Sequence, residues 1–143
     1  MNIVDLCNNK QVKMQQMPNG RPYLREQWEL HFANHLSDDE KKSIFLHDDR
    51  GYCGYLWHLF SYKKRECLRS QDANRAFNQT EKNACYVFYQ YKDEAYMIEN
   101  LSMITADELM DEADIYIVDK EFNWTYVITH ETGLCGPYFS SKN

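Results

Sequence analysis

The sequence lacks the short motifs by which many enzymes are identified, and it has few glycines and prolines. Its 143 residues include five glycines and three prolines. There is no glycine-rich phosphate loop, no G-x-S-x-G nucleophile turn and no H-E-x-x-H zinc motif. These absences leave no motif-based argument for nucleotide hydrolysis, serine hydrolysis or zinc-dependent proteolysis.

Long hydrophobic runs are also missing. No apolar stretch approaches the roughly 18–20 residues that a membrane helix needs. The first residues, "MNIVDLCNNKQVKMQQ", contain no basic region followed by an apolar run, so we expect no signal peptide. The sequence therefore predicts a soluble, cytoplasmic protein without membrane contact.

The five cysteines are scattered, odd in number and never arranged as C-x-x-C. This spacing argues against a disulfide framework and against a thiolate zinc site. We expect reduced thiols and no cofactor.

Aromatic residues, in contrast, are abundant: 11 Tyr, 7 Phe and 3 Trp in a chain that is 43% hydrophobic. A chain of this length and composition can bury its own core without disulfides or a structural metal. We expect residues 1–143 to form one domain whose core is dominated by large rings.

Helical signals are concentrated in the first half. Apolar residues four positions apart, after the turn residues of "PNG", predict a helix over residues 22–36. Ser37 and Glu40 have the spacing of a capping box, which predicts a second helix directly afterwards. A surface helix is expected over residues 68–79. Thr105 and Glu108 repeat the capping-box spacing and predict a further short helix.

Strand signals dominate the second half. The apolar run 54–62 is interpreted as a strand buried on both faces. Two hairpins are expected, one from "CYVFYQYKDEAYMIEN" and one from strands 114–119 and 124–130. The prediction is an α+β domain with a mainly antiparallel sheet of about five strands and helices packed on one face. Residues 1–20 are expected to be irregular, 22–49 helical and 54–140 sheet-forming.

Charge is distributed unevenly. The net charge is −6, yet residues 93–131 carry eleven acidic residues against one basic residue, Lys120, a net charge of −10. An acidic surface repels nucleic acid and attracts basic proteins. The candidate binding residues are three acids and three rings interpreted as exposed anchors: Asp107, Asp111, Glu112, Tyr116, Trp124 and Tyr138.

The stretch "WTYVITHETGLCGPYF" holds the candidate catalytic residues His130, Glu131 and Cys135. In a continuing strand, His130 and Glu131 point to opposite faces. They converge only if the strand ends between them, and the glycines and proline that follow show that the chain turns. A Cys–His pair at that turn could form a nucleophile. The alternative is a histidine that hydrogen-bonds a carbonyl beside a solvated glutamate.

His31 and His35 are four residues apart, which places both on one face of the predicted helix, the geometry of two metal ligands. A third ligand would have to come from elsewhere in the chain: His47, Asp48, Asp49, His58 or His130. The basic run "KKRECLR" could contact a phosphate or an acidic surface, although such runs are more typical of solvated helix starts.

The segments "LWHLFSY", "YIVDKEFNWTYVITHE" and "GPYF" resemble a family of small, uncharacterised proteins from Gram-positive bacteria that is known as a domain of unknown function. The resemblance covers most of residues 50–140 and implies no activity. The strand pair is also similar to the tails of some bacterial immunity-type proteins.

These observations favour a non-enzymatic binding protein, immunity- or inhibitor-like, whose acidic residues 93–131 dock on a basic protein. One alternative is a small hydrolase-like or metal-assisted enzyme that uses His130, Glu131 and Cys135, or His31 and His35. A second alternative is a structural or assembly subunit.

Overall fold

The computed structural model describes residues 1–47 and 54–142. The helical elements are α1 (Ile3–Lys10), α2 (Gly20–Phe32), α3 (Asp38–Ser43), α4 (His58–Ser61), α5 (Ser70–Gln79) and the 3₁₀ turns η1 (Leu101–Met103) and η2 (Ala106–Leu109). The strands are β1 (Met14–Gln16), β2 (Leu68–Arg69), β3 (Ala84–Tyr89), β4 (Ala95–Glu99), β5 (Ile115–Asp119), β6 (Trp124–Ile128) and β7 (Tyr138–Ser141). Within these described residues, no helix has the length and apolar character needed to cross a bilayer.

The strands form one antiparallel sheet in the order β1-β4-β3-β5-β6-β7-β2. The α+β class is therefore confirmed, but the sheet has seven strands and not about five. The three unpredicted strands, β1, β2 and β7, have two to four residues each. Strands this short show too few alternations to stand out from a loop.

Both predicted hairpins are present. β3 pairs with β4, and β5 pairs with β6 in a register that sets Ile115 opposite Ile128. Aromatic and β-branched residues suit a pleated, half-buried surface, and the polar segments between them form the turns. The second hairpin lies at the centre of the sheet and is buried on both sides, since all residues of β6 are buried.

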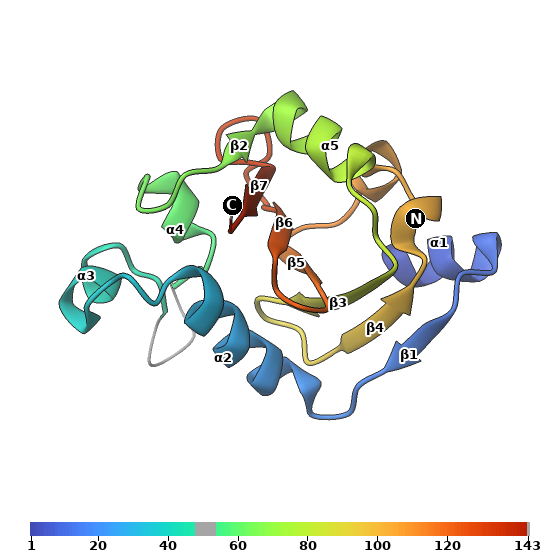
Figure 1. Ribbon diagram of the computed structural model, residues 1–143, viewed down its shortest axis with the longest axis horizontal. Coiled ribbons are helices and arrows are strands. Elements are labelled where there is room, and N and C mark those ends of the chain that lie inside the picture. Colours follow the sequence, from blue (N-terminus) through green and yellow to red (C-terminus); the bar gives the residue numbers. More distant parts are fainter. Residues whose placement is uncertain (48–53, 143) are drawn as a thin grey trace.

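Helices cover both faces of the sheet, so the expectation of one covered face was wrong. Figure 1 shows α2, α3 and α4 on one side and α1 and α5 on the other. Two core clusters match this arrangement. One contains Trp28, Phe60 and Tyr116, and the other contains Phe77 and Tyr126. Side chains alternate between the two faces along each strand, so a central strand contributes to both clusters.

The predicted strand at 54–62 was also wrong, because residues 58–61 form helix α4. Leu56, Trp57, Leu59 and Phe60 are buried at positions that follow a helical and not an alternating period. A short apolar run is compatible with either structure on its sequence alone.

The N-terminal segment is not irregular, since it contains α1 and β1. Asn2 is the N-cap of helix α1. Its side chain accepts a hydrogen bond from the backbone N–H of Asp5, and the Asp5 carboxylate accepts one from the backbone N–H of Asn2. Ile3, Leu6 and Cys7 form its buried face. The capping box here uses Asn and Asp in place of the usual Ser and Glu, and the helix has only eight residues.

The helix signals after residue 20 were closer to the structure. Helix α2 ends at Phe32, before the predicted residue 36. The capping boxes at Ser37 and Thr105 do start α3 and the 3₁₀ turn η2. Helix α5 starts at Ser70, because Leu68 and Arg69 pair with β7.

Candidate functional site

A recess of about 490 Å³ opens at the end of the sheet where β6 stops and β5 begins. Two segments form its walls. One is residues 55–62, which include α4, and the other is the turn that follows β6. The lining residues are Tyr55, Trp57, His58, Ser61, Tyr62, His130, Glu131 and Cys135. All three candidate catalytic residues therefore lie in one recess.

The convergence of His130 and Glu131 follows from the end of the strand. β6 stops at Ile128, and the N–H groups of Leu134 and Cys135 donate to the carbonyl of Glu131, at 2.9 and 2.8 Å, to close a turn. His130 Nε2 lies 3.7 Å from Glu131 Oε1. Gly136, at φ +96°, sits where a Cβ atom would come within 3.2 Å of the side chain of Thr129, so the turn requires glycine there.

Asp114 holds the two walls together. Its carboxylate lies 3.0 Å from Nδ1 of His130 and accepts hydrogen bonds from the His130 backbone N–H at 3.2 Å and from Trp57 Nε1 at 3.0 Å. The side chain of Asp114 is 18% exposed and that of His130 is 41% exposed. A carboxylate at Nδ1 fixes the orientation of the imidazole and leaves its other nitrogen toward the recess.

Aromatic rings surround this imidazole. The ring of Tyr55 lies 5.2 Å from that of His130 and 4.9 Å from that of Trp57, while His58 and Tyr62 continue the ring cluster. Tyr91 packs on the outer side of Tyr55, at 5.5 Å. Tyr62 and Tyr91 are each 46% exposed. Rings of this kind, partly open to solvent and next to carboxylates, are suited to contact with a cation.

Cys135 is poorly suited to act as a nucleophile. Burial, and then the neighbouring carboxylate of Glu131, raises the pKa of its thiol. A reactive cysteine needs a lowered pKa, because the thiolate is the nucleophile. The structure thus brings the three candidates together but places the thiol beside a negative charge.

Residues 1–139 match the model of a family described as Domain of unknown function (DUF4275). The chain belongs to this family. The resemblance to an uncharacterised family is thereby confirmed, and the match includes the N-terminal part that the resemblance did not cover. Searches of curated proteins and of solved structures found no match. The function of this DUF4275 chain must be argued from its own geometry.

His31 and His35 do not form a ligand pair, because α2 ends at Phe32 and breaks the assumed i, i+4 geometry. The His31 ring stacks on Phe122 at 4.7 Å, and burial, and then Lys142, lowers its pKa. His35 Nε2 is 2.6 Å from the carbonyl of Lys64. In the described ranges, no group of three or more potential ligand side chains is placed to hold a metal.

The other proposed metal ligands are also dispersed. His47 contacts Glu29 at 2.9 Å, and His58 Nδ1 lies 2.8 Å from the carbonyl of Phe45. His130 is held by Asp114. Asp48 and Asp49 lie outside the described residues.

The acidic residues of 93–131 do not form one surface. Glu112 is buried, 6% exposed, and accepts hydrogen bonds from the Ile3 N–H at 2.7 Å and the Tyr89 hydroxyl at 3.0 Å. Asp111 contacts the Met1 amino group. Asp107 is exposed in the first turn of η2. These acids face the α1 side of the molecule, whereas Asp93 and Glu94 follow β3 at the end of the sheet that holds the recess.

The three rings proposed as exposed anchors are buried instead. Tyr116 and Tyr138 are 0% and 1% exposed, and Trp124 is 7% exposed. Tyr116 packs on Phe88 and Trp124 on Phe139. Tyr116 and Trp124 lie on the inner strands β5 and β6, and Tyr138 on β7 packs against Phe60 of α4, so none is available to a partner.

Sequence reasoning missed Asp114, Tyr55 and Trp57 as site residues. One available signal was the hairpin of 114–119 with 124–130, whose register brings Asp114 next to the end of β6. Tyr55 and Trp57 could not be predicted as site residues, because residues 54–62 were assigned to a strand. Residues 58–61 of this segment form helix α4.

Proposed function

We propose that this protein is a non-enzymatic binding protein, in the manner of an immunity or inhibitor protein, that receives a basic side chain of a protein partner in the recess. The observation that carries the proposal is that the Glu131 carboxylate and the rings of Tyr55 and Tyr62 line the same opening. A lysine or arginine side chain there would lie against the rings and pair with the carboxylate.

The electrostatics of this end of the sheet support the proposal. Asp114 places a second carboxylate behind the imidazole, and Asp93 and Glu94 are exposed in the β3–β4 turn. Charges near an interface steer encounter and select partners more than they add affinity. The proposed docking surface therefore does not include all the acidic residues of 93–131. It comprises the recess and the β3–β4 turn beside it. A cytoplasmic location is part of this proposal.

A comparative pull-down tests the proposal. Tagged wild type is compared with Glu131→Gln, which removes the charge in the recess, and with Glu121→Gln, a matched control. Glu121 is exposed in the turn between β5 and β6, at the opposite end of the sheet. We expect a basic protein from the host lysate to bind the wild type and the control and to elute with salt. Equal capture by Glu131→Gln would reject the recess as the site.

One observation favours a second candidate function, general acid–base catalysis by His130. A histidine oriented by the partly buried Asp114, with its Nε2 near the Glu131 carboxylate that lines an open recess, has the geometry of a catalytic base. This enzyme would use His130 and Glu131, with Cys135 lining the recess and not attacking the substrate. Hydrolysis of small ester or phosphodiester probes that is lost in His130→Gln would support it over the binding proposal.

A further inference from the structure

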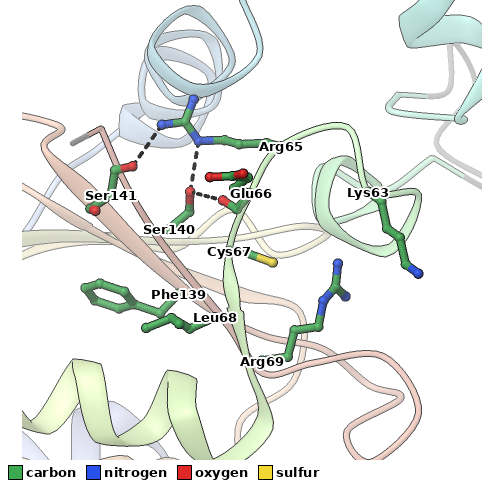
Figure 2. Close-up of a pocket in the computed structure, with 9 residues that line it drawn as sticks. All are labelled: Lys63, Arg65, Glu66, Cys67, Leu68, Arg69, Phe139, Ser140 and Ser141. Carbon is green, nitrogen blue, oxygen red and sulfur yellow. Dashed lines mark hydrogen bonds between the residues drawn. The ribbon is translucent and has the colours of Figure 1, made fainter.

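A second recess, of about 540 Å³, lies on the other side of α4, where residues 63–69 run beside β7. Figure 2 shows its lining. The side chains of Lys63 and Arg69 extend into the same space beside Cys67, and Arg65 lies along the far wall with Ser140 and Ser141. Three of the nine lining residues are cationic and one, Glu66, is acidic.

Arg65 is fixed in the wall. Its Nε donates to Ser140 Oγ at 2.9 Å, Nη1 to the Phe32 carbonyl at 3.3 Å and Nη2 to the Ser141 carbonyl at 3.1 Å. The guanidinium also lies over the Phe32 ring, at 5.2 Å. A guanidinium has five N–H groups, so two remain without a hydrogen bond to the described part of the chain. Burial of the guanidinium lowers the pKa of Arg65.

Arg69 is less constrained. Its Nη2 donates to the carbonyl of Phe60 at 2.7 Å, at the end of α4, and its guanidinium lies 5.1 Å from the Tyr138 ring. Its remaining N–H groups make no hydrogen bond to the described part of the chain. Lys63 is exposed at the rim.

The three cations have no ion-pair partner among residues 1–47 and 54–142. Among the described residues, five other Lys or Arg side chains pair with carboxylates, namely Lys10, Lys13, Arg21, Lys41 and Arg75, and seven others do not, so it is the gathering of three cations that distinguishes this recess. In a protein of net charge −6, this recess is locally positive, since three cations and only one carboxylate, Glu66, line it. An anion that binds between Lys63 and Arg69 would accept charge-assisted hydrogen bonds from both.

We propose that this recess binds a phosphate monoester of a small organic molecule. Lys63 and Arg69 contact the phosphate oxygens with charge-assisted hydrogen bonds, and the organic part occupies the remaining volume of the recess. Arg and Lys are the usual partners of phosphate, since guanidinium binds two oxygens at once. The volume of about 540 Å³ exceeds that of an inorganic phosphate, so the recess has room for an organic substituent. The proposal does not depend on the function assigned to the His130 recess.

The test is a titration of the isotopically labelled protein with phenyl phosphate, followed by NMR. We expect saturable shifts of the Leu68, Arg69 and Ser140 amide signals, with a Kd of about 1 mM or tighter, as a few charge-assisted contacts provide. Benzoate, which has the same ring and a single charge, should bind at least about fivefold more weakly. Equal binding of benzoate would overturn the assignment to phosphate.

Three variants locate the binding. Lys63→Gln should weaken it about threefold, and Lys63→Gln combined with Arg69→Gln about tenfold. Lys64→Gln is the matched control, because Lys64 is the exposed neighbour that does not line the recess. Affinity that falls equally in Lys64→Gln and Lys63→Gln, or the absence of saturable shifts in the wild type, would overturn the proposal. Since the exposed Lys63 side chain makes no hydrogen bond or ion pair with residues 1–47 and 54–142, its variant stays informative even if the Arg69 variant unfolds.

Discussion

Nδ1 of His130 lies 3.0 Å from Oδ2 of Asp114, across 16 residues of sequence. The contact joins the turn after β6 to the residue before β5, and Trp57 Nε1 joins the same carboxylate from the segment before α4. Asp114 therefore sets the position of the imidazole, one wall of the recess and the attachment of α4. Shape and charge at this end of the sheet depend on one partly buried carboxylate.

We predict that Asp114→Ala lowers the free energy of unfolding by about 3 kcal/mol, because Trp57 Nε1 and the His130 N–H lose their acceptor. Asp114→Asn should lose clearly less, since its amide oxygen accepts the same two hydrogen bonds. Urea denaturation of both variants measures the difference. Identical unfolding of Asp114→Ala and the wild type would show that the carboxylate does not hold the walls.

Glu112 should be required for folding stability and not for partner binding. Glu112→Ala leaves the Ile3 N–H and the Tyr89 hydroxyl without an acceptor, so we expect a loss of about 2–4 kcal/mol. The exposed neighbour Asp107 is the control, and Asp107→Asn should stay within about 0.5 kcal/mol of the wild type. Thermal and urea unfolding measure both. A Glu112→Ala protein as stable as the control would contradict the buried contacts.

Lys82 is a buried cation, 2% exposed, whose Nζ donates to the carbonyls of Phe77 and Thr80 at the end of α5. Lys82→Met keeps the length of the side chain and removes its donors, leaving two helix-end carbonyls without a partner. We expect a loss of about 2 kcal/mol. Lys120→Met, at an exposed position, serves as the control in the same denaturation experiment. A gain in stability for Lys82→Met would show that the desolvation of the buried ammonium group destabilises the fold by more than its two hydrogen bonds stabilise it.

The pH dependence of Cys135 alkylation distinguishes a thiol from a nucleophilic thiolate. The pKa of the Cys135 thiol is raised, so its thiolate forms at a higher pH than that of the same cysteine in the unfolded chain. Because iodoacetamide reacts with the thiolate, the alkylation rate of the folded protein should also rise at a higher pH. Glu131→Gln removes one cause of the increase, so its rate profile should move toward lower pH. Mass spectrometry of the Cys135 peptide gives both profiles. Rapid alkylation of the wild type at neutral pH would instead favour a nucleophilic role.

The parts of the fold that the sequence predicted are those with local causes. The hairpins β3–β4 and β5–β6 combine strand-forming residues with polar turns, and the caps at Ser37 and Thr105 act within four residues. The errors concern elements stabilised by distant contacts. Strand β1 exists because it pairs with β4, and β7 because it pairs with β6 and β2. Neither contains enough residues to show a pattern of its own.

The candidate site shows the same division. His130, Glu131 and Cys135 are close in sequence, and the glycines that follow indicated the turn that brings them together. Asp114 reaches them only through the pairing of β5 with β6, and Tyr55 and Trp57 only through the packing of segment 55–62 against that hairpin. The rings of Tyr116, Trp124 and Tyr138 were predicted to be exposed because helices were expected on one face of the sheet only. Helices cover both faces, and the three rings are buried.

The most direct test of the binding proposal is a titration with a hexa-arginine peptide, monitored at the indole N–H signal of Trp57. This N–H donates to Asp114 at the wall of the recess, so occupancy should shift it. We expect a saturable shift in the wild type and in Glu121→Gln, and about fivefold weaker binding in Glu131→Gln, the factor that roughly 1 kcal/mol gives. An unshifted indole signal, or equal affinity in all three proteins, would contradict a basic side chain bound in this recess.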